Sequence, residues 1–134
     1  MRRWYEASKK YMDYRMGVLG GAVMGTIVAL INLPESAAGG LTAGSKQAVY
    51  TFTVGSMTTK MCEHLAVRVR KKSLAYLLAV AIPAGFTITA SYGIHTLKGT
   101  PKPLQSTIPT MIAAPIGCLY WARRKRNALE EMIE

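Results

Sequence analysis

Long runs without a charged side chain alternate with short basic segments along this chain. Three of these runs, residues 16–33, 73–97 and 103–122, contain no Asp, Glu, Lys or Arg. An α-helix needs about 20 predominantly apolar residues to cross the hydrocarbon core of a bilayer. Each run is therefore predicted to form a membrane-spanning helix. Pro83 in one of these runs, and Pro109 and Pro115 in another, predict that these two helices are kinked.

The basic residues predict how many times the chain crosses. Of its 17 Lys and Arg residues, 13 form three clusters that flank the runs. These clusters are Arg2, Arg3, Lys9, Lys10 and Arg15; Arg68, Arg70, Lys71 and Lys72; and Arg123, Arg124, Lys125 and Arg126. Positive charge stays on the cytoplasmic or matrix side of a membrane. Only an even number of crossings puts all three clusters there, so the more polar run 45–66 is predicted to be a fourth span.

The remaining segments complete a single membrane domain of 134 residues. Residues 1–15 combine aromatic and basic side chains, which predicts a helix lying at the inner interface. Residues 123–134 are predicted to be a cytoplasmic tail. No cleavable signal peptide is recognisable, and we expect a bacterial inner (plasma) membrane, with an organellar inner membrane as the alternative. Cys62 and Cys118 fall on the reducing side and are expected to stay reduced.

Small residues recur every four positions in the first half of the chain. They are Gly17, Gly21 and Gly25 in the first span, and Gly40, Gly44 and Ala48 after it. Such a repeat lines one face of a helix and lets another helix backbone approach closely. Two repeats on consecutive helices predict a tight, glycine-zipper hairpin.

This glycine-stepped hairpin, from Gly17 to Ala66, resembles that of the Tim translocase family. The resemblance implies a compact four-span membrane protein and covers less than half of the chain. The third and fourth spans here carry prolines in place of glycine steps. The Arg/Asp pattern that the family has after its second span is absent, so the resemblance concerns helix packing.

The second span carries an unusual number of polar side chains. They include Lys46, Gln47, Tyr50, Thr51, Thr53, Thr58 and Lys60. Hydroxyl and amide groups are tolerated in a membrane inside a helix bundle or beside water. Two interpretations follow: the side chains are buried and hold the bundle together, or they line a polar pathway.

A second group of candidate residues lies on the outer side. His95, Lys98 and Lys102 flank the loop between the third and fourth spans. Together with free backbone N–H groups at a helix end, they predict a small site for an anion or a lipid headgroup. The alternative is an ordinary loop made of turn-forming residues.

Other chemistries are not supported by the sequence. Met57, Met61 and His64 recur at helical spacing beside Cys62, but Cys62 and His64 point apart on a helix, and no CxxC or HxxxH motif is present. We therefore expect no metal and no cofactor. The two histidines are predicted on opposite sides of the membrane, which indicates that the protein is not an enzyme. Uncharged runs interrupt the basic clusters, which argues against nucleic-acid binding.

The sequence thus predicts an all-α integral membrane protein with four transmembrane helices and both termini inside. We expect a structural or accessory subunit of a larger membrane assembly. The alternative is a small homo-oligomeric channel or transporter in which the second span lines a pathway. Expected partners are the lipid bilayer, other membrane subunits or a second copy, and anionic headgroups at the basic clusters.

Overall fold

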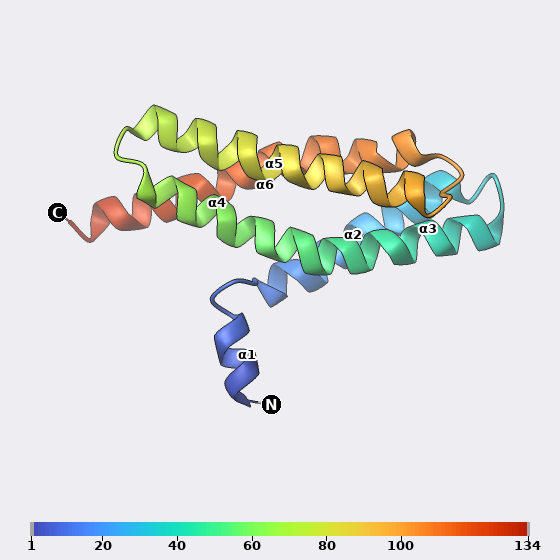
Figure 1. Ribbon diagram of the computed structural model, residues 1–134, viewed down its shortest axis with the longest axis horizontal. Coiled ribbons are helices and arrows are strands. Elements are labelled where there is room, and N and C mark those ends of the chain that lie inside the picture. The colour runs from blue at the N-terminus through green and yellow to red at the C-terminus, as the bar shows by residue number, and fades with distance from the viewer. Residues whose placement is uncertain (1, 134) are drawn as a thin grey trace.

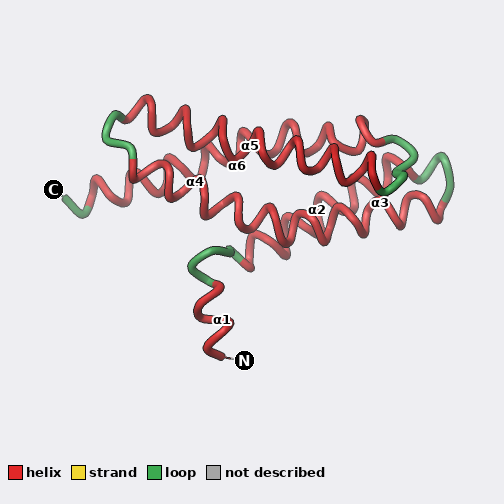
Figure 2. Tube along the Cα trace, viewed as in Figure 1, coloured by secondary structure: helices red, strands yellow, loops and turns green. Residues whose placement is uncertain are grey.

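The chain folds into helices throughout the part that the structure describes. A computed structural model describes residues 2–133, with side chains from Tyr5 onward. The elements are α1 (Arg2–Ser8), α2 (Tyr14–Asn32), α3 (Ala37–Tyr50), the π-helical turn η1 (Thr51–Gly55), α4 (Ser56–Arg68), α5 (Lys72–Leu97) and α6 (Pro103–Glu131). No strand occurs in residues 2–133 (Figure 2), so the all-α prediction is confirmed.

The helices form an elongated bundle around one long rod. Elements α3, η1 and α4 follow one another without a break, and we call this unit the rod. Helix α2 packs against α3 and η1, whereas α5 and α6 pack against each other and against α4 (Figure 1). The short helix α1 projects away from the bundle. The rod therefore connects α2 to the pair formed by α5 and α6.

Within residues 2–133, two helices are long and apolar enough to cross a membrane. They are α2 and α5, with mean hydropathies of 1.6 and 1.7 over their most apolar stretches. The rod and α6 are more polar. The first and third predicted spans thus coincide with helices of suitable length and composition.

The second predicted span begins earlier than expected. Residues 45–66 were the predicted range, but the helix begins at Ala37 and runs to Arg68. Ser36 starts it, because its hydroxyl accepts a hydrogen bond from the backbone N–H of Gly39 at 2.9 Å. At about 1.5 Å per residue the rod is about 48 Å long, which exceeds the roughly 30 Å hydrocarbon core of a bilayer.

Both ends of the chain differ from the predicted ranges. The interfacial helix expected over residues 1–15 ends at Ser8. A new helix begins after Asp13, whose carboxylate accepts a hydrogen bond from the N–H of Met16 at 3.1 Å. The expected tail, residues 123–134, continues α6 as far as Glu131. Met1, Glu134 and the side chain of Trp4, one of the aromatic residues of the segment 1–15, lie outside the part that the structure describes.

The prolines lie inside uninterrupted helices. Pro83 sits in α5, and Pro109 and Pro115 sit in α6. Each proline lacks the N–H that would bond to the carbonyl four residues earlier. The helices continue through these positions, so the prolines weaken the backbone ladder without ending it.

Helices α2 and α3 are in backbone contact at the glycine steps. A Cβ added to Gly44 would lie 2.6 Å from the carbonyl oxygen of Gly25, and one added to Gly21 would lie 2.9 Å from that of Ala48. A Cβ on Gly40 would lie 2.9 Å from the carbonyl oxygen of Ala29. Real Cβ atoms do not approach a backbone so closely, so this separation of the two helices requires glycine.

The buried side chains are mostly small or polar, whereas many of the exposed side chains are large and apolar. Buried positions include five alanines with no exposed area, at 43, 66, 75, 79 and 122, and the polar residues Asn32, Gln47 and His95. Exposed positions include Leu19, Ile27, Leu30, Leu41, Val49, Leu77, Phe86, Ile112 and Ile116. Water-soluble domains normally bury Leu, Ile, Val and Phe. This chain distributes them in the opposite way.

Candidate functional site: a buried polar network

Gln47 is the centre of a buried hydrogen-bond network that links four elements. Its amide Nε2 donates to the hydroxyl of Thr51 in η1 at 3.0 Å and to that of Thr110 in α6 at 3.3 Å. Its Oε1 accepts from Ser91 at 3.4 Å and from His95 at 2.9 Å, both in α5. The side chain is 1% exposed. Both donors and both acceptor sites of this amide are therefore used within the protein.

The position of the Gln47 oxygen fixes the form of His95. Because Oε1 can only accept, Nε2 of His95 must carry the proton. Its Nδ1 lies 3.0 Å from the hydroxyl of Thr100. The imidazole is 1% exposed. Nε2 of His95 is thus the donor to Gln47, and both ring nitrogens have hydrogen-bond partners.

A second layer of polar contacts joins the rod to α5. The hydroxyl of Tyr50 donates to the carbonyl oxygen of Thr87. The hydroxyl of Thr87 lies 2.7 Å from that of Thr58. Thr58 also donates to the carbonyl of Val54 in the turn before it. These contacts satisfy the polar groups at the middle of the rod.

Asn32 connects the end of α2 to the start of α6. Its Nδ2 donates to the hydroxyl of Ser106 at 2.7 Å and to the carbonyl of Val28 at 2.9 Å. Its Oδ1 accepts from the backbone N–H of Lys102 at 3.1 Å. This fully buried amide therefore closes the bundle at the loop between α5 and α6.

The seven residues of the predicted polar pathway face different surroundings. Gln47, Tyr50 and Thr58 are buried within the network, and Thr51 is half-buried beside them. Thr53 is exposed and bonds to its own helix at the carbonyls of Val49 and Tyr50. Lys46 donates to the carbonyl of Lys98, and Lys60 pairs with Glu63 at 3.1 Å. The structure thus brings four of the seven residues together inside the bundle: Gln47, Tyr50, Thr51 and Thr58.

The three residues of the predicted anion site have separate partners. His95 turns inward to Gln47, as described above. The side chain of Lys98 is exposed, and Lys102 pairs with Glu35 at 2.9 Å. The imidazole predicted for this site therefore belongs to the buried network.

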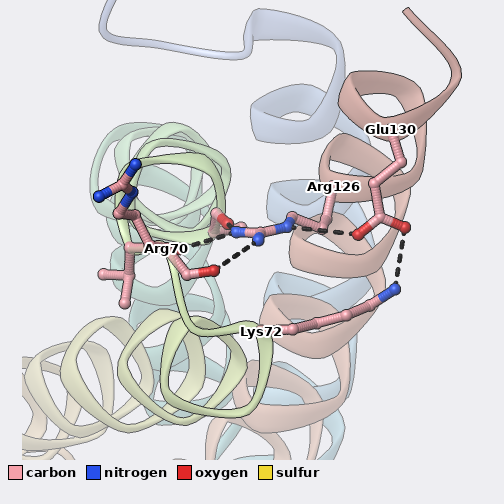
Figure 3. A network of polar contacts seen from close by, with 6 residues as sticks. Arg70, Lys72, Arg126 and Glu130 are labelled. Carbon is pink, nitrogen blue, oxygen red and sulfur yellow. Dashed lines mark hydrogen bonds and ion pairs between the residues drawn. The ribbon is translucent and has the colours of Figure 1, made fainter. Parts of the chain in front are cut away.

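A separate set of polar contacts, here called the polar lock, joins the helices at the opposite end of the bundle (Figure 3). The guanidinium of Arg126 in α6 donates to the carbonyls of Ala66 and Val69, both at 2.8 Å, and of Arg70, at 3.0 Å. These carbonyls lie at the C-terminal end of α4, where a helix leaves its last acceptors unpaired. Arg126 thereby ties the last turns of α6 to the loop before α5.

Glu130 extends this lock to the start of α5. Its carboxylate lies 2.9 Å from the ammonium of Lys72 and 3.5 Å from Nε of Arg126. The hydrogen bond from Lys72 lowers the pKa of Glu130 and raises the pKa of Lys72 itself. Both groups are solvent-exposed, so their attraction is screened by salt.

The described residues contain no cluster of three or more His, Cys, Asp or Glu side chains. Met57 and Met61 line a surface hollow together with His64, whereas Cys62 is buried. His64 accepts a hydrogen bond from Arg68 at 2.9 Å. The structure therefore separates the methionine and histidine side chains from Cys62.

Several residues with buried polar contacts were not predicted from the sequence to bond between helices. They are Asn32, Ser91, Thr100, Ser106 and Thr110. A usable signal was present in α5, where Thr87, Ser91 and His95 recur every four residues on one face of an otherwise apolar helix. Polar residues that share one face of an apolar helix indicate a polar neighbour on another helix.

The network offers hydrogen bonds between its own groups, with no free nucleophile or base among the described residues that form it. Its arrangement suits the joining of helices in an apolar medium. Compared with known proteins, the chain matches no family model, no curated protein and no solved structure.

Proposed function

We propose that this protein is a four-span integral membrane protein that serves as a structural or accessory subunit of a larger membrane assembly. The observation that carries this proposal is the distribution of side chains: small and polar residues inside, large apolar residues outside. Such a surface needs lipid or another apolar helix against it. A bacterial inner membrane, or an organellar inner membrane, supplies both.

Four crossings fit the arrangement of charge. In this proposal α2, the rod, α5 and α6 each cross once, which leaves both termini on the cytoplasmic or matrix side. The basic residues of the loop from Val69 to Lys71 and of the end of α6 lie at one end of the bundle (Figure 1). Basic residues gathered at one end suit the inner surface of a membrane and its anionic headgroups.

The pairing of the polar residues favours a structural role over transport. A pathway for a polar solute needs groups that are free to bind it in turn. Gln47 and Tyr50 are bonded to other side chains or to backbone, and Thr58 bonds to Thr87. These contacts support the interpretation in which the polar residues hold the bundle together.

A surface suited to another helix lies along α2 and α3. Two adjoining hollows, here called the outer groove, share Gly21, Ala22 and Ala48. The exposed side chains along the outer groove are Val18, Ala22, Thr26, Leu41, Ser45 and Val49. Its small side chains, Ala22 and Ala48, allow close approach of a further transmembrane helix. We propose that a helix of a larger membrane subunit packs there.

Native mass spectrometry of the tagged protein, extracted gently from its own membrane, tests this function. The expected result is a fixed stoichiometry with at least one larger membrane protein. Ala22→Leu should fill the outer groove and release that partner, whereas Ala81→Leu, on the exposed face of α5, should retain it. A closed homo-oligomer without other subunits would contradict the proposal and support a channel.

Accessibility of the rod to water provides a second test. Cysteines introduced at positions 51 and 58, in a background without Cys62 and Cys118, should be protected from a charged thiol reagent added to intact membranes. A cysteine at Lys98, which is exposed in the loop before α6, is the control and should react. Reaction at positions 51 and 58 would support a polar pathway.

A further inference from the structure

A cavity between α2, the rod and α6 is lined by four sulfur-containing side chains. Its volume is about 170 Å³. Met16 and Met24 reach it from α2, Cys62 from α4 and Cys118 from α6. Four sulfur residues from three helices therefore share one cavity, although they are distant from one another in the sequence.

The two cysteines lie in one buried cluster. Cys62 is fully buried and Cys118 is 3% exposed, and both pack in one cluster with Ala84 of α5. Both cysteines are free thiols. Two buried thiols from different helices therefore line the same cavity.

The remaining wall of the cavity favours a soft ion of low charge. None of its described lining residues is Lys, Arg, His, Asp or Glu, and most of its surface is apolar. Its oxygen groups are hydroxyls such as those of Thr59 and Thr110, which are weak ligands for hard cations. A cation bound here must be neutralised by the cysteines alone, because burying net charge is costly.

We propose that this cavity is a binding site for Cu(I). Thiolate and thioether sulfur atoms are the ligands that this soft monovalent ion prefers. One thiolate cancels its single positive charge, and the second cysteine and the methionines add neutral sulfur donors. Zn(II) would require two thiolates for neutrality and prefers four nitrogen or thiolate ligands. The single negative charge that one thiolate supplies and the sulfur type of the ligands both favour Cu(I) over Zn(II).

Binding is an exchange of a proton for a metal ion. A copper–sulfur bond forms at one cysteine as its S–H bond breaks, and the proton passes to the solvent. A thioether lone pair of Met16 or of Met24 adds a further donor without losing a proton. Copper remains in the +1 state and no sulfur is oxidised. Since one proton is released, affinity should rise about tenfold per pH unit below the thiol pKa.

The test is an anaerobic titration of the purified full-length protein with Cu(I) in competition with a chromophoric chelator. We expect one equivalent to bind. The double variant Cys62→Ser with Cys118→Ser should lose at least about a hundredfold in affinity, and Met16→Leu with Met24→Leu about tenfold. Met57→Leu removes an exposed methionine from another surface and should leave affinity unchanged. X-ray absorption of the wild-type complex should show sulfur ligands alone.

Several outcomes would overturn the proposal. They are binding that survives loss of both cysteines, nitrogen or oxygen ligands in the absorption spectrum, or an affinity that does not change with pH. The last two are measured on the wild-type protein, so they decide the matter even if the cysteine variants fail to fold. The site requires no partner subunit, and its failure would leave the proposed assembly role in place.

Discussion

Nε2 of His95 lies 2.9 Å from Oε1 of Gln47, and this contact joins α5 to the rod. From the sequence, the two residues belong to separate candidate sites, one at an outer loop and one along the second span. In the fold they satisfy each other inside the bundle. The network around them is therefore one structural unit.

Replacing both members of this pair should cost less than the sum of the two single replacements. Gln47→Leu leaves a buried imidazole N–H without an acceptor, and His95→Phe leaves the amide oxygen with only the long contact to Ser91. Each single change should destabilise the protein by about 1–3 kcal/mol. The double variant should cost less than the sum, because the contact between the two side chains is then removed without leaving either of them unpaired.

Unfolding of the four proteins in mixed detergent micelles measures this coupling. Thr53→Val is the control, because Thr53 is exposed and bonds to its own helix, and it should change stability by less than about 0.5 kcal/mol. Strictly additive effects would show that the two residues do not act together.

The contact between α2 and α3 should not tolerate a methyl group. Gly44→Ala places a Cβ 2.6 Å from the carbonyl oxygen of Gly25 and should destabilise the protein by about 1–3 kcal/mol. Gly93→Ala makes the same chemical change in α5, where nothing lies within 4 Å. It should be neutral or stabilising by up to about 1 kcal/mol, because alanine favours a helix. Equal effects at the two sites, measured by thermal unfolding, would contradict close helix packing.

Arg126 should contribute more to stability than its neighbours in the same basic cluster. Arg126→Met leaves three backbone carbonyls at the end of α4 without their donor and should cost about 2–3 kcal/mol. Arg126→Lys keeps the charge but lacks the forked donors, so it should recover only part of that loss. Arg123→Met, at an exposed position, is the control.

Amide hydrogen exchange shows where in the chain Arg126→Met reduces stability. In Arg126→Met, the amides from Val69 to Lys72 should exchange faster, whereas those around Gln47 should keep their protection. Uniform loss of protection along the chain would indicate a general destabilisation in place of a lost local lock.

The ion pair between Lys72 and Glu130 should make stability depend on pH in the acidic range. The pKa of Glu130 is lower in the folded protein than in the unfolded chain. Its stabilisation is therefore complete above the unfolded pKa of about 4.3 and disappears as the pH falls through the folded value. The raised pKa of Lys72 works in the opposite direction, so its stabilisation disappears at alkaline pH.

Glu130→Gln removes this dependence. The difference in melting temperature between wild type and Glu130→Gln should shrink as the pH is lowered through the acidic range, and should also shrink with added salt. A difference that stays constant with pH would show that the ion pair does not form. Glu6→Gln, in the exposed Lys9–Glu6 pair of α1, is a matched control outside the bundle.

The helices were predictable because apolar runs and charge clusters depend on local sequence. Residues 73–97 and the helix Lys72–Leu97 agree closely for this reason. The start of the rod was not predictable from hydropathy, because residues 37–44 are mostly small and neither strongly apolar nor charged. The hydroxyl of Ser36 determines where the rod begins. The hydrogen-bond partner of His95 was also not predictable from the sequence, since Gln47 is 48 residues away and only the packing of α3 against α5 brings the two together.

The π-helical turn in the rod determines how the fold responds to the deletion of one residue. A π turn contains one residue more than the α-helical turn it replaces. Deleting one residue from Thr51–Gly55 would therefore leave an unbroken α-helix in which the residues after it keep nearly the same orientation, whereas deleting one residue from α3 would rotate everything after it by about 100°. In the second case, the face that meets α2 and the face that meets α5 and α6 would no longer fit at the same time. The π turn thus absorbs one surplus residue without changing which faces of the rod meet their neighbours.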